Sequence, residues 1–307
     1  MANVKTAFII NPQAGNGSTG RSWPGLAPYA RKRLGAFQPL VTKRPGDAFS
    51  CSRRAVEAGV ERLICMGGDG TLNEVINGIM AASDKHAPPI LGFVPNGTGC
   101  DLVRTLSIPR EVKAAVDLIA ANQIRFLDIG RLTFAGPGKR TVHRYFHNIT
   151  SFGIGGEVDA RVNRTTKAFG PFLSFMWATL ISVLSYDKKQ VRLRTESGVD
   201  QTVRVWNVAI ANGQFHGGGM WVAPEARVDD GRFHITVIGD LSLAAVCRNL
   251  PRLYNGRIGR IAQVSMMTAT RIQAESAEKV LLDVDGEQPG RLPLTAEIVP
   301  RALRIIA

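Results

Sequence analysis

Short apolar runs and helix-like stretches alternate along the first third of the chain, and this alternation constrains the fold more than any other feature. The apolar runs are KTAFIINP, QPLVT, RLICMGG and PILGFVP, and helical patterns lie near Trp23 to Leu34, from Ala48 to Ala58 and from Leu72 to Ala81. Strands separated by helices of this length are typical of parallel βαβ units in a doubly wound sheet. Because ligands bind at the carboxyl ends of such strands, we expect the loops NPQAGNGST, TKRPGD, GGDGT and PNGTGCD to face one crevice.

The pattern changes after about Asp128. The later segments RYFHNITSFGI, QVRLRTE, TVRVWNVAIAN, GRFHITVIGD, RIQAES, KVLLDVDGE and LTAEIVP are short alternating runs divided by Gly, Pro and Asp. Such runs are typical of an antiparallel, β-rich domain. We therefore predict an α/β domain over residues 1–130 and a β-rich domain over residues 131–307. We allow the extreme C-terminus, about residues 300–307, to return to the first domain.

The net charge is strongly positive. With 38 Lys and Arg against 25 Asp and Glu, the formal charge of +13 favours an anionic partner such as nucleic acid, an acidic membrane surface or a phosphate-bearing ligand. Nucleic acid is disfavoured, because only four tyrosines and no RNP, KH or zinc-finger pattern accompany the basic residues. The cysteines form no CxxC pair, and the apolar run before Asn11 is too short for a secretory segment. We therefore expect a cytoplasmic protein with reduced thiols.

One segment is apolar enough to raise the question of a membrane span. It is FGPFLSFMWATLISVLSY, residues 169–186, which is just long enough to be considered. However, Thr179, Ser182 and Ser185 recur every three residues and place hydroxyls on one helical stripe. We therefore expect an amphipathic helix in this segment rather than a span.

The loop GGDGT suggests phosphate binding. Glycines between a strand and a helix let backbone N–H groups crowd around phosphate oxygens, and the N-terminus of the following helix adds a favourable dipole. Neither a Walker A motif nor the GxGxxG of dinucleotide folds is present, so neither of those mechanisms applies. Asp69 would repel phosphates unless it binds a cation, the backbone or a ribose, so Mg²⁺ is implied. The alternative is a tight turn in which Asp69 caps the helix.

Five motifs, in order along the chain, resemble one family. GGDGTLNEV, with NPQAG before it and PNGTGCDLVR, NGQFHGGGMWVAPEARVDDGRFHI and DVDGE after it, resembles the diacylglycerol kinase catalytic family, which includes bacterial lipid kinases and sphingosine and ceramide kinases. The resemblance covers nearly the whole chain, whereas GGDG alone also resembles NAD kinases and phosphofructokinases. It implies a nucleotide-binding α/β domain, a β-sandwich-like second domain, ATP and Mg²⁺, and phosphorylation of a lipid hydroxyl.

The same resemblance implies a nucleotide site in the first domain. Its residues are Asn11, Thr42, Gly67, Gly68, Asp69, Gly70, Thr71, Leu72, Asn73, Glu74 and Thr98. Glycine suits such a site because its bare amides can reach phosphate, and asparagine and threonine supply neutral hydrogen bonds. For Asn11 and Thr42 the alternative role is a cap at a strand end. Cys100 stands where the family usually has asparagine, and because a thiol is a poor hydrogen-bond partner, we expect the support of that loop to differ.

The segment DVDGE is the expected centre of the chemistry. Attack of a hydroxyl on the γ-phosphoryl group needs a proton acceptor, and a carboxylate can serve as one. The resemblance implies that Glu287 is this acceptor, with Asp285 beside it as a sharer of the role. Strand alternation places Asp283, Asp285 and Glu287 on one side, provided that the strand continues through Gly286. Without the family, the alternative is three acids on a solvated strand edge.

A second acidic segment is PEARVDDGRFHI, which by itself is typical of a simple turn. The resemblance implies a structural cation here, held by Asp230 and by the backbone carbonyls of Arg227 and Arg232. Backbone carbonyls are plausible ligands of a hard cation because they do not depend on the side chain.

A lipid substrate also requires a surface that meets the membrane. The segment AAVCRNLPRLYNGRIGR mixes arginines with apolar side chains, which suits anionic headgroups, although Pro251 and Gly256 disfavour a clean helix. Its arginines are Arg248, Arg252, Arg257 and Arg260, and a second basic patch comprises Arg161, Arg164 and Lys167. The alternative for the first segment is a solvated basic face.

We thus predict an ATP-dependent lipid kinase that is cytoplasmic and peripherally associated with an anionic membrane surface. The sequence leaves open the oligomeric state and the lipid, which is diacylglycerol, ceramide, a sphingoid base or phosphatidylglycerol. One alternative is a soluble NAD kinase-like enzyme, which fits the later segments less well. Another is a catalytically silent lipid-binding relative, which the retained Asp69, Asp285 and Glu287 argue against.

Overall fold

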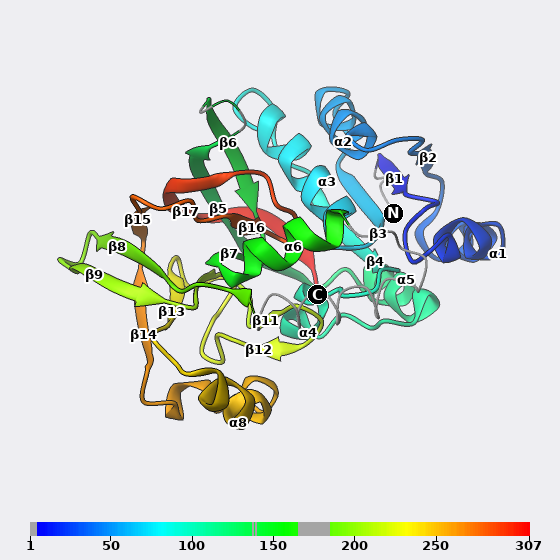
Figure 1. Cartoon of the computed structure of the whole chain (residues 1–307). Helices are drawn as coiled ribbons and strands as arrows, with labels where there is room; N and C mark the ends of the chain where they lie inside the picture. The colour runs from blue at the N-terminus through cyan, green and yellow to red at the C-terminus, as the bar shows by residue number, and fades with distance from the viewer. Residues whose placement is uncertain (1–4, 137, 139, 165–184) are drawn as a thin grey trace. The chain divides into compact units, whose positions relative to one another are not determined.

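The chain forms two compact units. The computed structural model describes residues 5–136, 138, 140–164 and 185–307. Unit 1 comprises Met1–Ile129 and Pro300–Ala307, and unit 2 comprises Gly130–Val299. The boundary predicted from the sequence lies at residue 130, with residues 300–307 allowed to return to the first domain. Figure 1 shows the course of the chain from the N-terminus to the C-terminus.

Unit 1 is built on a parallel sheet. Its strands are β1 (Thr6–Ile10), β2 (Gln38–Val41), β3 (Arg62–Gly67), β4 (Ile90–Pro95) and the end of β17 (Arg291–Ile306), in the order β2-β1-β3-β4-β17. Neighbouring strands pair in parallel. β1 is buried along its whole length and β3 along nearly all of it, as the continuous apolar runs require of strands covered on both faces.

Helices cover this sheet. They are α1 (Ser18–Leu34), α2 (Asp47–Glu57), α3 (Asp69–Ala82), α4 (Leu102–Leu106) and α5 (Val112–Ala121). Leu26 of α1 and Val116 of α5 share one buried cluster with Phe8 and Ile64 of the sheet. α2 packs on α3, where a β-carbon at Gly78 would overlap Ser52. The predicted doubly wound α/β domain is therefore confirmed.

Unit 2 is an antiparallel sandwich. Its strands are β5 (Ile124–Ala135), β6 (Thr141–Phe146), β7 (Ile149–Gly153), β8 (Lys189–Thr195), β9 (Asp200–Val205), β10 (Asn207–Ala211), β11 (Phe215–His216), β12 (Met220–Trp221), β13 (Phe233–Ile238), β14 (Val264–Ala269), β15 (Arg271–Glu275), β16 (Leu282–Val284) and β17. One sheet has the order β14-β13-β10-β7-β16, and in the other β17, β15, β8 and β9 are neighbours. Phe152 and Ile235 of the first sheet share a core with Val191 and Leu294 of the second, which confirms the predicted sandwich.

Among the described residues of unit 2, the helical segments include α6 (Ile154–Arg164), α8 (Leu243–Tyr254) and the 3₁₀ turn η3 (Ile258–Arg260). α8 corrects an expectation, because it runs through Pro251 rather than breaking there. Pro251 lies in the last turn of the helix, and at the other end the hydroxyl of Ser242 caps the helix by accepting from the N–H of Ala245.

The predicted amphipathic helix over residues 169–186 lies almost wholly outside the described residues, and so does Lys167 of the second basic patch. Within the ranges that the structure describes, no helix is both long and apolar enough to span a bilayer.

Candidate functional site

The GGDGT segment of unit 1 joins a buried strand to a helix, and a single residue, Gly68, lies between them. β3 ends at Gly67, Gly68 is extended with φ −99° and ψ −175°, and α3 begins at Asp69. A β-carbon at Gly67 would lie 2.7 Å from Oγ1 of Thr71, so the first glycine leaves room for a side chain of the helix. The first backbone N–H groups of a helix have no partner within the helix, and they point toward its N-terminal end. This end of α3 therefore has the geometry that favours an anion.

Hydrogen bonds join the strand-end loops of unit 1. Nδ2 of Asn11 donates to Oγ1 of Thr71 at 2.9 Å. The backbone N–H of Asn96 donates to the carbonyl of Gly67 at 2.8 Å, and Oγ of Ser18 donates to Oδ1 of Asn96 at 3.0 Å. The loops after β1, β3 and β4 are thus held together at the carboxyl edge of the sheet. Asn96 was not among the predicted residues, although its place at a strand end matches that of Asn11.

The loop after β2 is held by Glu74. Its two carboxylate oxygens accept from the backbone N–H groups of Gly46 at 2.9 Å and Ala48 at 3.1 Å, at the N-terminus of α2. The carboxylate of Glu74 therefore caps a helix of the fold. The side chain of Leu72 is fully buried in the core. That either residue contacts a nucleotide, as the family resemblance implies, stays a prediction.

Two glycines allow the loops after β3 and β4 to touch. A β-carbon at Gly97 would lie only 2.5 Å from Cα of Gly68, and one at Gly68 would lie 3.3 Å from Cα of Gly97. Part of the close approach that the sequence analysis attributed to phosphate is therefore an approach between two segments of the same chain. The predicted Thr98 follows Gly97 and is exposed, whereas Thr42 and Asn73 are buried.

Asp69 holds the second of these loops. Its Oδ2 accepts the backbone N–H of Cys100 at 2.6 Å, so the carboxylate braces the loop after β4. Cys100 has a φ of +50°, a left-handed conformation that asparagine, the residue that the resemblance implies here, adopts more readily. Burial, and then the charge of Asp69, raise the pKa of the Cys100 thiol to about 12. The thiol is therefore neutral at neutral pH and adds no charge beside Asp69.

If these loops form the predicted nucleotide site, Gly97→Ala is expected to lower ATP affinity or turnover by roughly 10²-fold, because a displacement of about 1 Å in a positioning loop can have an effect of that size. The added methyl group meets the backbone of Gly68, which cannot move aside as a flexible side chain would. Gly25→Ala is the matched control, since a β-carbon at this position of α1 has no atom within 4 Å. Equal ATP titrations for the two variants would contradict the role of this loop contact.

The DVDGE segment of unit 2 is a tight turn. β16 ends at Val284, and Val284 and Glu287 exchange backbone hydrogen bonds across Asp285 and Gly286. These two central residues have φ values of +49° and +86°, as in a type I′ turn, for which Asp-Gly is a favoured pair. The strand therefore does not continue through Gly286. The expectation that all three acids lie on one side of a strand was wrong for this reason.

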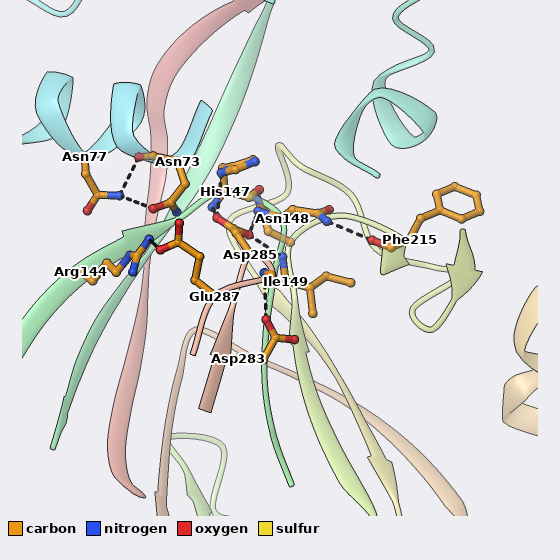
Figure 2. A network of polar contacts seen from close by, with 12 residues as sticks. Asn73, Asn77, Arg144, His147, Asn148, Ile149, Phe215, Asp283, Asp285 and Glu287 are labelled. Carbon is orange, nitrogen blue, oxygen red and sulfur yellow. Dashed lines mark hydrogen bonds and ion pairs between the residues drawn. The ribbon is translucent and has the colours of Figure 1, made fainter. Parts of the chain in front are cut away.

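Asp285 is buried and accepts several hydrogen bonds. Its Oδ1 accepts from the backbone N–H groups of Asn148 and Ile149, each at 3.1 Å, and its Oδ2 accepts from that of His147 at 3.0 Å. Nδ1 of His147 lies 2.8 Å from the same Oδ2. Figure 2 shows the carboxylate directed at this run of backbone. Asp285 thus holds in place the backbone that leads into β7.

Glu287 has a different environment. Its side chain is 46% exposed, and Oε2 lies 2.5 Å from Nη2 of Arg144 on β6 (Figure 2). A reacting hydroxyl group can therefore reach the carboxylate of Glu287, whereas the side chain of Asp285 is only 1% exposed. Arg144 was missed in the sequence, where it is one of many arginines on alternating strands.

Asp283 forms a third arrangement. Its carboxylate is buried, with Oδ2 at 2.8 Å from Nε2 of His216 and at 3.1 Å from Oγ of Ser151. Oδ1 accepts the backbone N–H of Gly286, so Asp283 also stabilises the turn that presents Glu287. The three acids of DVDGE therefore differ in partners and in exposure.

The predicted cation site at Asp230 lies in a turn before β13. Oδ1 of Asp230 accepts from the backbone N–H of Arg232 at 3.1 Å, and Oδ2 lies 3.0 Å from Nε2 of His234. A carboxylate has about four lone-pair positions, so these two contacts leave acceptor capacity for a hard cation. Among the described residues there is no cluster of three or more His, Cys, Asp or Glu side chains that could hold a metal. The cation at Asp230 stays a prediction.

Asp230→Ala is expected to lower the melting temperature of the protein, because Arg232 and His234 both lose a partner in the turn. If the predicted cation binds, added Mg²⁺ should raise the melting temperature of the wild type more than that of the variant. Melting curves with EDTA and with Mg²⁺ measure both effects. An identical response to Mg²⁺ in the two proteins would remove the cation from this turn.

Two family descriptions match the chain. Residues 5–132 match "Diacylglycerol kinase catalytic domain", and residues 148–307 match "YegS C-terminal NAD kinase beta sandwich-like domain". The second match alone spans more than half of the chain. Together the matches cover most of both units.

Curated relatives match over nearly the full length. A diacylglycerol kinase of Staphylococcus carnosus is 30% identical over 293 residues, which cover 94% of this chain and 90% of the relative. One from Staphylococcus aureus is 28% identical, over 99% of this chain and 92% of the relative. Among solved structures, a diacylglycerol kinase of Bacillus anthracis has a TM-score of 0.74 and 21% identity, covering 100% and 97% of the two chains. Yeast NADH kinase has a TM-score of 0.51 and 11% identity, covering 98% and 82%, so both show likeness of fold alone.

Proposed function

Because the chain belongs to the diacylglycerol kinase family of lipid kinases, we propose that it transfers the γ-phosphoryl group of ATP to the hydroxyl of a diacylglycerol-like lipid. The observation that carries the proposal is the close approach of the loops after β3 and β4, which meet at Gly68 and Gly97 beside the N-terminus of α3. A backbone cradle of this kind suits polyphosphate.

We assign nucleotide binding to the loops of unit 1. The N-terminal N–H groups of α3 would donate to phosphate oxygens, and Asp69 would keep the loop after β4 in place through Cys100. Asn11 holds Thr71 and thereby fixes the start of the helix. Mg²⁺, which we propose as the cation that accompanies ATP, supplies neutralisation of phosphate charge. The protein's own contribution is then orientation of the phosphates.

We assign proton acceptance to Glu287. In the transfer, the lipid hydroxyl oxygen bonds to the γ-phosphorus while the bond from that phosphorus to the β,γ-bridging oxygen breaks, and ADP leaves. The hydroxyl proton passes to a carboxylate oxygen of Glu287, which the turn at Asp285 and Gly286 presents to solvent. Arg144 orients the carboxylate through its ion pair, and Asp283 supports the same turn.

A panel of acceptors tests the proposal. Purified protein with labelled ATP and Mg²⁺ is incubated separately with diacylglycerol, ceramide, a sphingoid base, phosphatidylglycerol and NAD⁺. We expect label in one of the lipids, with diacylglycerol the best acceptor. Label in NAD⁺ alone would favour the NAD kinase-like alternative. Binding of lipid without any transfer would identify a catalytically silent relative.

A further inference from the structure

The helix α8 of unit 2 carries a stripe of apolar side chains on its solvent side. Leu243, Leu250 and Tyr254 are 39%, 48% and 55% exposed, and Cys247 is exposed as well. These positions are separated by four, three and four residues, so they lie along one face of the helix. Exposed apolar residues scattered singly need no explanation, but a contiguous stripe indicates a contact surface.

The stripe is additional to the face that α8 packs on the unit. Val246 and Leu253 pack against a separate cluster that contains Trp206, Leu241 and Ile258. Packing within the unit therefore explains the apolar side chains on one side of the helix, but it does not explain those of the exposed stripe. Met266 of β14, which is 37% exposed, lies beside η3, because a β-carbon at Gly259 of η3 would lie 3.2 Å from its sulfur.

Arginines surround the stripe. Arg248, Arg252, Arg257 and Arg260 are all exposed, and the segment from residue 241 to residue 263 contains no Asp or Glu. Within the described part of the chain, none of these four arginines forms an ion pair with a carboxylate. The guanidinium of Arg252 donates to Oδ1 of Asn249 at 2.9 Å, which holds it along the helix. The surface thus combines exposed apolar groups with four positive charges.

We propose that this surface, formed by α8, η3 and Met266 and called here the α8 surface, docks the protein on an anionic lipid bilayer. The inference rests on the proposed lipid substrate. Apolar side chains would enter the interfacial region of the bilayer while the arginines contact lipid phosphates. A second copy of the chain fits less well, because the same surface on both copies would bring like charges together. Nucleic acid would match the arginines but not the apolar stripe.

Contacts inside unit 2 connect the α8 surface with the acidic turn. Gly256, just after α8, lies against Trp221 of β12, and Trp221 stacks on Phe215 of β11 with ring centroids 5.2 Å apart. The carbonyl of Phe215 accepts from Nδ2 of Asn148, whose backbone N–H donates to Asp285 (Figure 2). A bilayer bound to α8 would therefore contact a helix that is linked, through Trp221, Phe215 and Asn148, to the turn that carries Glu287.

Cosedimentation with vesicles, measured without ATP, tests the docking separately from catalysis. The vesicles contain phosphatidylcholine with or without phosphatidylglycerol, at low and high salt. We expect wild-type protein to bind the anionic vesicles and to be released by salt. Leu250→Ser with Tyr254→Ser should weaken binding by about 10- to 100-fold through the loss of buried apolar area. Arg248→Glu with Arg257→Glu should weaken it by at least about fivefold for each arginine.

The controls separate docking from folding and from catalysis. Ile124→Ser removes an apolar side chain of similar exposure from β5, and Lys32→Glu with Lys85→Glu reverses two exposed charges in unit 1. Both should bind vesicles as the wild type does. The α8 variants should keep the wild-type melting temperature and the turnover of a soluble short-chain diacylglycerol. Unchanged vesicle binding in both α8 variants would overturn the proposal. It would also be overturned if Leu250→Ser with Tyr254→Ser converted a dimer into a monomer and left vesicle binding unchanged.

If no lipid is phosphorylated but the α8 variants still lose vesicle binding, the proposed function fails and the docking surface stands. If lipids are phosphorylated and vesicle binding is independent of α8, the docking surface fails and the proposed function stands. The two claims are therefore distinguishable in the same set of proteins.

Discussion

Glu287→Gln is expected to lower lipid phosphorylation by roughly 10² to 10⁴-fold while ATP binding changes little. Glutamine keeps the shape of the side chain and can still accept a hydrogen bond from Arg144, but it cannot take up the hydroxyl proton. The side chain is half-exposed and lies at the end of a two-residue turn, so the substitution should leave the fold intact. Steady-state turnover together with an ATP titration measures the two parts of this expectation.

Arg144→Lys is the matched comparison for that variant. It keeps a positive charge near Glu287 but removes the guanidinium geometry, so it should reduce turnover less than Glu287→Gln does. The variant tests positioning, since Arg144 acts through Glu287. Near-normal turnover in Glu287→Gln would show that another group accepts the proton.

Asp285→Ala is expected to lower the free energy of unfolding by about 3 to 5 kcal/mol, the range for removing one partner of a buried charged network. Three backbone N–H groups, those of His147, Asn148 and Ile149, would lose their acceptor in the protein interior. Alanine is also disfavoured at a φ of +49°. Urea unfolding of the variant and the wild type measures the difference.

Asp285→Asn separates the backbone effect from the charge effect. Asparagine tolerates the left-handed conformation, so it should recover part of the stability that alanine loses, while one carboxylate oxygen is replaced by a donor. Loss of turnover in either variant is interpretable only beside its unfolding curve. If Asp285→Ala and Asp285→Asn both kept the wild-type stability but lost all turnover, Asp285 would have a role in the chemistry and not in stabilising the fold.

The α/β domain could be predicted because its signals are local and mutually consistent. β1 and β3 are continuous apolar runs, and each ends in a polar or glycine-rich loop before a helix. α5 was missed although Glu111 caps it by accepting from two backbone N–H groups, those of Lys113 and Ala114. Glutamate is not among the favoured N-cap residues, so this start signal is weak in the sequence.

The roles of the acids could not be predicted from spacing. Alternation along a strand is a statement about extended backbone, and the Asp-Gly pair at 285–286 leaves that conformation. Which acid is buried then depends on β7, a segment more than 130 residues earlier in the sequence. The role of Asp69 could not be predicted for the same reason, because its partner Cys100 lies in the loop after the next strand, β4. Long-range backbone contacts of this kind leave no periodic signal.

A single mixture tests lipid phosphorylation by this chain most directly. It contains wild-type protein, γ-labelled ATP, Mg²⁺, vesicles with diacylglycerol, and NAD⁺ as a competing acceptor, and a parallel mixture contains Glu287→Gln. We predict that wild-type protein places the label on the lipid as a phosphomonoester, and that transfer by Glu287→Gln is slower by at least about 10²-fold. Label on NAD⁺ with none on the lipid would contradict the proposed reaction. Equal lipid labelling by the two proteins would contradict the assignment of Glu287 as the proton acceptor.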